Sequence, residues 1–180
     1  MEKKIYLVLS QTGTVFSRIL KFFTHAEYNH VSISLTADME KMYSFGRLNP
    51  YNAFVGGFVE EGKDKGTFKR FENTKVLIFE IAVSNEKYNI IKYFIKYFVQ
   101  HKTEFHYNYL GLLFACFKKD YKRKNRFYCS QFVRTCLACC NVENANELPK
   151  IIKPIDFLKL KNKRILFTGL LKNYIITVGE

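Results

Sequence analysis

Apolar runs separated by turn residues predict that the chain opens with a strand and a short helix. Lys4–Leu9 is an almost wholly apolar run that includes β-branched residues, as is typical of a buried strand. Thr12-Gly13-Thr14 then offers turn and N-cap chemistry. In Val15–Phe23, which follows, apolar residues recur at helical spacing. This stretch is therefore predicted to be an amphipathic helix.

From His30 the period of the pattern changes to two. His30, Ser32 and Ser34 alternate with apolar residues, a turn follows at 36–38, and Met42–Phe45 resumes an extended pattern. These features predict a hairpin with one polar side. Residues 46–74 carry five glycines and a proline and predict a long irregular excursion, of the kind that usually has a function or is disordered.

The second half of the chain alternates between strand and helix signals. Lys75–Ile81 is typical of a strand, and Ser84 or Asn85 can cap a helix that runs to about His101 with an apolar stripe. A shorter apolar helix is predicted over Tyr109–Phe117. A further helix begins near Cys129, because the following apolar residues and cysteines share one helical face with it.

The last segment predicts a short helix near Asp156 and two closing strands, Arg164–Thr168 and Tyr174–Val178, around Gly169. No internal repeat or break in composition divides the chain. The order of elements predicts one α+β domain over residues 1–180, with an antiparallel sheet packed against helices.

Composition and charge narrow the class of protein. The 180 residues are 48% apolar, enough for a hydrophobic core, and 29 Lys and Arg against 16 Asp and Glu give a formal net charge of +13. This charge favours an anionic partner, or else it reflects a lysine-rich source proteome. The lysines are scattered, and the one dense basic run, 118–126, is typical of a solvated loop, so nucleic acid is the less favoured partner.

The chain shows no signal-peptide pattern and no apolar run of the roughly 20 residues that a membrane helix needs. All five cysteines lie between Cys116 and Cys140, where disulfide geometry would be poor, so we expect free thiols in a reducing, cytoplasmic setting. His25, His101 and His106 have no partner at zinc-ligand spacing. We therefore predict neither a metal nor a cofactor.

Two residues are candidates for covalent chemistry. Cys129 is predicted in the first turn of a helix, where the dipole and unpaired amides stabilise a thiolate. The alternative is that this thiol is a small buried apolar group. His30, at the head of a strand, is either a base for that thiol or a surface imidazole.

Four runs of the sequence resemble a known family. They are Tyr28-Asn29-His30-Val31-Ser32-Ile33, Tyr109-Leu110-Gly111-Leu112, Phe127-Tyr128-Cys129-Ser130-Gln131-Phe132-Val133 and Lys153-Pro154-Ile155-Asp156-Phe157-Leu158. In this order they resemble the circularly permuted branch of the papain-like NlpC superfamily, especially its YiiX-like bacterial members. The resemblance implies a permuted papain-like fold, with Cys129 as nucleophile and His30 as base.

The family also uses a third polar residue, on the strand after the histidine, to orient the imidazole. In the matching strand only Ser44 is polar with suitable alternation, and a serine is a weaker orienting group than a carboxylate. Glu60 or Glu61 could serve instead if the glycine-rich segment folded back toward His30. Backbone amides at Cys129 and Ser130 are the first candidates for an oxyanion site.

Two functions are carried forward. The first is a thiol hydrolase or acyltransferase that acts on an amide or ester bond, in a peptide, a muropeptide fragment or a lipid. The second is a catalytically silent domain that keeps the papain-like shell and holds an anionic partner on its basic surface. Neither the substrate nor the assembly state follows from the sequence.

Overall fold

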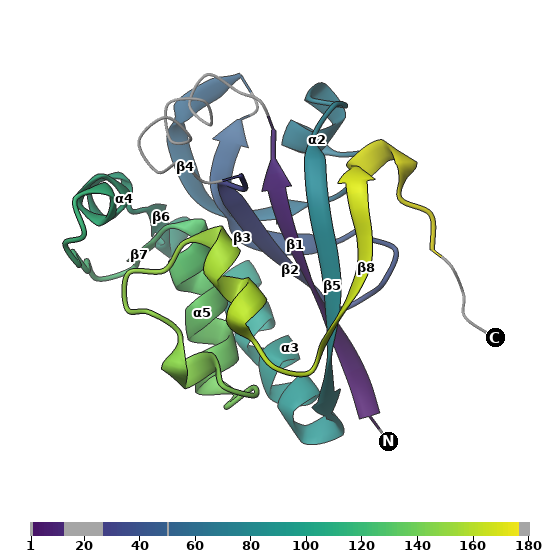
Figure 1. Cartoon of the computed structure of the whole chain (residues 1–180). Coiled ribbons are helices and arrows are strands. Elements are labelled where there is room, and N and C mark those ends of the chain that lie inside the picture. Colours follow the sequence, from purple (N-terminus) through teal and green to yellow (C-terminus); the bar gives the residue numbers. More distant parts are fainter. Residues whose placement is uncertain (1, 13–26, 50, 177–180) are drawn as a thin grey trace.

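The computed structural model describes residues 2–12, 27–49 and 51–176, and these form an α+β protein built on one sheet (Figure 1). The described strands form an eight-stranded sheet in the order β7-β6-β4-β3-β2-β1-β5-β8. All neighbouring described pairs are antiparallel except β6 (His106–Tyr107) with β7 (Arg126–Phe127), which is parallel. The α+β prediction is confirmed at this level.

The strand predicted first lies in the middle of the sheet. β1 (Glu2–Gln11) pairs with β2 (His30–Ser34) on one side and with β5 (Lys75–Ser84) on the other. Its apolar centre is fully buried because both sheet faces are covered there. The strands predicted at Lys4–Leu9, at His30–Leu35 and at Lys75–Ile81 are therefore confirmed.

The prediction of an irregular excursion over residues 46–74 was wrong. β3 (Met42–Asn49) and β4 (Asn52–Glu61) form a long antiparallel hairpin, and α2 (Gly66–Arg70) follows it. Two glycines that resembled turn signals instead permit close approach. A Cβ on Gly56 would lie 2.9 Å from the side chain of Tyr107, and one on Gly57 would lie 3.0 Å from the Phe105 carbonyl.

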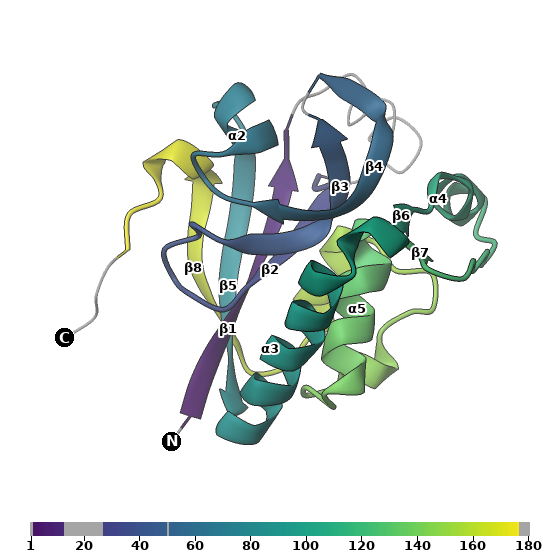
Figure 2. The ribbon, with the colours of Figure 1, turned by 180° about the vertical axis from the view of Figure 1, so that it is seen from behind.

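Three longer helices follow the predicted pattern. They are α3 (Asn85–Gln100), α4 (Tyr109–Cys116) and α5 (Cys129–Cys139). The Ser84 hydroxyl caps α3 by accepting a hydrogen bond from the Lys87 amide at 3.2 Å. Figures 1 and 2 show α3 and α5 side by side on one face of the sheet, while α4 lies out beyond them.

Two apolar clusters sit on opposite faces of the sheet. The larger lies under α3 and α5 and includes a group of phenylalanine rings around Phe45, with centroid separations of 5.5 Å to Phe132 and 5.8 Å to Phe58. The smaller includes Val8 and Met42 and is covered in part by Phe68 of α2. The first cluster positions the start of α5 against β2 and β3.

The remaining elements are short. They comprise η1 (Lys102–Glu104), η2 (Ala145–Glu147), η3 (Pro154–Lys159), β8 (Lys163–Leu170) and η4 (Leu171–Asn173). β8 confirms the first closing strand and η3 the short helix near Asp156. The second closing strand, Tyr174–Val178, is not formed over 174–176, and 177–178 lie outside the described residues.

The predicted helix Val15–Phe23 also lies outside the described residues. Within the ranges that the structure describes, no helix is both long enough and apolar enough to span a bilayer.

Candidate functional site

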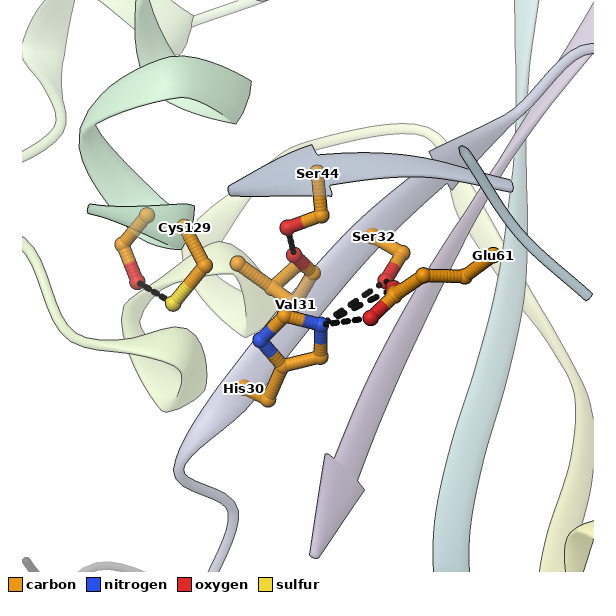
Figure 3. Close-up of polar contacts among 7 residues, drawn as sticks. His30, Val31, Ser32, Ser44, Glu61 and Cys129 are labelled. Atoms are coloured by element: carbon orange, nitrogen blue, oxygen red, sulfur yellow. Dashed lines mark hydrogen bonds and ion pairs between the residues drawn. The ribbon is translucent and has the colours of Figure 1, made fainter. Parts of the chain in front are cut away.

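Cys129 is the first residue of α5 (Figure 3). The helix start is fixed by the Gln131 side chain, whose oxygen accepts a hydrogen bond from the Tyr128 amide at 3.2 Å. The side-chain hydroxyl of Ser130 lies 3.9 Å from the Cys129 sulfur. Cys129 is only 4% exposed, so the site is largely closed to solvent. Its thiol lies at the N-terminus of α5, where the helix dipole favours a negative charge.

His30, the first residue of β2, brings its imidazole between Cys129 and Glu61 (Figure 3). Its Nε2 lies 2.9 Å and 3.1 Å from the two carboxylate oxygens of Glu61. The Nδ1 side of the ring is directed at Cys129 (Figure 3), and each of the two groups shifts the pKa of the other. The two groups that the sequence separates widely therefore meet in the fold.

Glu61 is held in place by Ser32, another residue of β2. It is the last residue of β4, and the Ser32 hydroxyl donates to its Oε2 at 2.5 Å. Ser32 Oγ is also 3.3 Å from His30 Nε2. The ring of Phe68 in α2 lies 6.5 Å from the imidazole, and the Glu61 side chain is 11% exposed. The carboxylate is thus fixed and shielded beside the ring that it contacts.

This arrangement moves the two pKa values in opposite directions. Burial alone would lower the pKa of His30, but the charge of Glu61 and the contacts with Cys129 and Glu61 outweigh it and raise that pKa to about 10. Burial would raise the pKa of Cys129, yet the His30 contact, the Val31 amide and Ser130 lower it. A thiolate beside an imidazolium is therefore the favoured state of the pair.

Ser44 does not occupy the position that the sequence analysis gave it. Its hydroxyl is fully buried and donates to the Val31 carbonyl at 2.6 Å, while the carboxylate that contacts the imidazole belongs to Glu61 (Figure 3). A carboxylate both accepts a hydrogen bond from the ring N–H and offsets the imidazolium charge, whereas a serine could only accept the hydrogen bond. Ser44 instead binds the backbone carbonyl of Val31, the residue whose backbone amide helps to lower the pKa of the thiol.

A small apolar pocket opens at the thiol, with a cavity volume of about 50 Å³. Its walls come from the start of α5, from one face of α4 and from the segment before η3. The lining residues include Leu112, Ala115, Cys116, Tyr128, Cys129, Ser130, Ile152 and Pro154. Any molecule that reaches the sulfur from this side contacts mainly hydrocarbon.

Two buried tyrosines flank the same site. The pKa values of Tyr107 and Tyr128 are raised, first by burial and next by the nearby Cys129 thiolate. Both hydroxyls therefore keep their protons near neutral pH and remain hydrogen-bond donors. Together with the free amides at the start of α5, they make the surroundings of the thiol rich in donors.

The other cysteines lie elsewhere or differ chemically. Cys116 lines the pocket, but burial raises its pKa. Cys136 is buried on α5, Cys140 is buried at the C-cap of α5, and Cys139 is exposed. Over residues 2–12, 27–49 and 51–176, no group of three or more His, Cys, Asp or Glu side chains has a geometry that would hold a metal ion.

No protein-family model, no curated protein and no solved structure gives a significant match to this chain.

Sequence reasoning found Cys129 and His30 as candidates and left Glu61 as an alternative. Glu61 was hidden because residues 46–74 were interpreted as irregular chain, so no strand register linked it to His30. Ser32 was overlooked, although the alternation that places it on the same face as His30 is visible in the sequence. That alternation was the available signal.

Proposed function

We propose that this protein is a thiol hydrolase or acyltransferase that acts on an amide or ester carbonyl, with a permuted papain-like arrangement of its site. The observation that carries the proposal is the row Cys129, His30 and Glu61, in which a thiol at a helix N-terminus meets an imidazole whose far nitrogen lies 2.9 Å from a carboxylate. This is the geometry of a nucleophile, a base and an orienting group.

The chemistry follows from the charges. The Cys129 sulfur attacks the carbonyl carbon, a C–S bond forms, and the carbonyl electron pair moves to oxygen near the α5 amides. The C–N or C–O bond then breaks, and the His30 imidazolium gives its proton to the leaving group. Water or another acceptor attacks the thioester, His30 takes its proton, and the C–S bond breaks to release the product and restore the Cys129 thiolate beside the His30 imidazolium.

The test is acylation by a p-nitrophenyl ester, followed by peptide mapping of all five cysteines. We expect the acyl group on Cys129, and we expect His30→Ala to abolish this reaction at neutral pH. The matched control is Cys116→Ser, which removes the other thiol of the same pocket and should leave the rate unchanged.

Slow labelling spread evenly over the five cysteines would refute the enzyme. That result would support the alternative of a silent domain that uses its positive charge to hold an anionic partner. Glu61 beside His30 favours the enzyme over the silent domain. The main support for the silent domain was that a serine, Ser44, would be a weak orienting group for the imidazole.

A further inference from the structure

Helix α4 exposes an apolar stripe on the side away from the pocket. Leu110, Leu113 and Phe117 follow helical spacing through the end of α4, and they are 44%, 55% and 67% exposed. The helix itself, Tyr-Leu-Gly-Leu-Leu-Phe-Ala-Cys, contains no charged residue. Its only fully buried residue is Gly111. An apolar stripe of this kind on a projecting helix marks an interaction surface.

The chain that follows α4 is the most basic part of the molecule. Residues 118–126 hold six basic side chains and one acidic one, and all of them but Arg126 are exposed. The loop folds back on α4, because the Phe114 and Tyr121 rings lie 5.0 Å apart and the Asn108 side chain donates to the Tyr121 carbonyl at 3.0 Å. Apolar stripe and basic loop therefore belong to one surface.

We propose that α4 and the basic loop 118–126 dock on an anionic lipid bilayer. A bilayer surface presents negative headgroups outside and hydrocarbon within, and this surface presents lysines and arginines beside apolar side chains. Charge complementarity selects this occupant over an apolar groove on another protein, because such a groove offers no anionic counterpart to a loop with six basic side chains and one acidic one, Asp120, which pairs with Lys122 at 3.7 Å.

The opposite face of α4 gives this docking a consequence for the site. Leu112, Ala115 and Cys116 of that face line the pocket that leads to Cys129. A bilayer in contact with the outer face thus lies one helix away from an apolar pocket at the thiol. Resting on the proposed function, this makes the acyl ester of a membrane lipid the substrate class, with the acyl chain in the pocket.

The chain contains no tryptophan, so a single introduced indole reports on docking. We expect the emission of Phe117→Trp to shift to shorter wavelength with vesicles of phosphatidylcholine and phosphatidylglycerol in equal parts, and not with phosphatidylcholine alone. Tyr93→Trp is the matched control, since Tyr93 is 76% exposed and belongs to α3, a different helix from α4 (Figure 1). Its emission should not respond.

Vesicle sedimentation tests the two components separately. Leu113→Glu should abolish binding to the mixed vesicles, whereas Ile165→Glu, on β8 with a similar 56% exposure, should leave it intact. Reversing Lys118 and Lys119 to Glu should weaken binding by more than about tenfold, because each basic residue near an anionic surface contributes roughly a fivefold factor. Reversing Lys92 and Lys96 on α3 is the control for net charge.

Failure of wild-type protein to sediment with the mixed vesicles, or equal losses in test and control variants, would overturn the docking proposal. Sedimentation is measured with Cys129→Ala as well, which should bind as the wild type does. Docking without acylation of Cys129 would overturn the proposed function, and with it the lipid-ester substrate class, but not the docking surface. Acylation without docking would overturn this inference alone.

Discussion

At the scale of single residues, the site depends on one carboxylate that reaches the imidazole from the far end of β4. Glu61 lies 2.9 Å from His30 Nε2, and its charge is the main reason why the pKa of His30 rises to about 10 although burial acts in the other direction. The raised pKa of His30 and the lowered pKa of Cys129 have a common origin, because imidazolium and thiolate stabilise each other.

Glu61→Gln should therefore weaken the thiolate. Without the carboxylate charge the pKa of His30 falls and that of Cys129 rises, so alkylation of Cys129 by iodoacetamide should shift to higher pH. At neutral pH we expect a rate about 10- to 100-fold lower, the size of a charge-assisted hydrogen bond. Alkylation rates of the Cys129 peptide, measured by mass spectrometry from about pH 5 to about pH 10, test this expectation. This range covers the ordinary pKa values of histidine and cysteine.

Glu60→Gln is the matched control for that experiment. Glu60 precedes Glu61 on β4 and is exposed, and its side chain points to the other face of the strand. A profile for Glu60→Gln that moves as far as the Glu61→Gln profile would mean that net charge, and not the contact with His30, sets the reactivity.

Ser32→Ala tests the hydroxyl that holds the carboxylate. The loss of a 2.5 Å hydrogen bond to Glu61 should lower Cys129 alkylation at neutral pH by about tenfold while the apolar core stays intact. Ser34→Ala is the control, because Ser34 is equally buried on β2 but donates to backbone carbonyls of Thr36 and Lys41. If Ser34→Ala reduced alkylation as much as Ser32→Ala, the hydroxyl would be structural only.

The candidate site was predictable from the sequence only in part, and the reason lies in β4. Cys129 and His30 stand in patterned elements, so their local positions followed from periodicity. Glu61 follows a glycine-rich stretch that resembles a loop, and its contact with His30 depends on the β3–β4 register. The prediction for Ser44 depended on alternation alone. Alternation shows which face of the sheet a side chain lies on but not which residue it contacts.

At the scale of elements, local patterns predicted the helices and failed where tertiary packing gave glycines a different use. Gly56 and Gly57 sit inside β4 because the chain around Phe105 and Tyr107 packs directly on the strand. Glycine is required there because a side chain would block this close approach. A single sequence does not distinguish a glycine used for close packing from a glycine in a turn. The helices α3 and α5 have continuous apolar faces, so their patterns were unambiguous.

Gly111 in α4 is another glycine used for packing, and it supports a prediction. Alanine in place of glycine usually stabilises a helix by up to about 1 kcal/mol. At Gly111, however, the added Cβ would collide with the Asn108 side chain, whose oxygen caps α4 by accepting from the Gly111 amide at 3.0 Å. We expect Gly111→Ala to lower the free energy of unfolding by about 1–3 kcal/mol, the cost of a lost cap and an unpaired buried amide.

The effect should depend on Asn108. Urea unfolding of Gly111→Ala, Asn108→Ala and the double variant forms a closed cycle. In the Asn108→Ala background the collision with the Asn108 side chain is removed and the approach of 2.8 Å to the Tyr121 carbonyl remains, so the Gly111→Ala substitution should cost less than it does in the wild type. Equal costs in both backgrounds would show that the collision with Asn108 is not the cause of the loss.

At the scale of the whole molecule, 29 basic residues against 16 acidic ones make each well-placed carboxylate valuable for stability. Glu80 on β5 is one of them. It accepts from Arg164 of β8 at 2.8 Å and lies 3.1 Å from Lys4 of β1, so it links three neighbouring strands. Burial would raise its pKa, but the hydrogen bonds and charges of Arg164 and Lys4 lower it.

A carboxylate whose pKa is lowered by folding stabilises the folded state when it is ionised. The contribution of Glu80 is therefore present above the ordinary glutamate pKa of 4.5 and is lost as the pH falls through its lower folded value. Since Lys4 and Arg164 are largely exposed, at 48% and 69%, solvent screens the interaction, and we expect Glu80→Gln to cost no more than about 1 kcal/mol at pH 7.

Urea unfolding of wild type and Glu80→Gln at pH 7 and at about pH 3 measures this difference, because the lower pH lies below the ordinary glutamate value. The gap between the two proteins should shrink or vanish at the lower pH, whereas Glu72→Gln, at an exposed position, should match the wild type at both. A gap of constant size would assign the effect of Glu80 to packing. A gap that closes would assign the effect of Glu80 to its negative charge, which is the scarcer sign of charge in this basic chain.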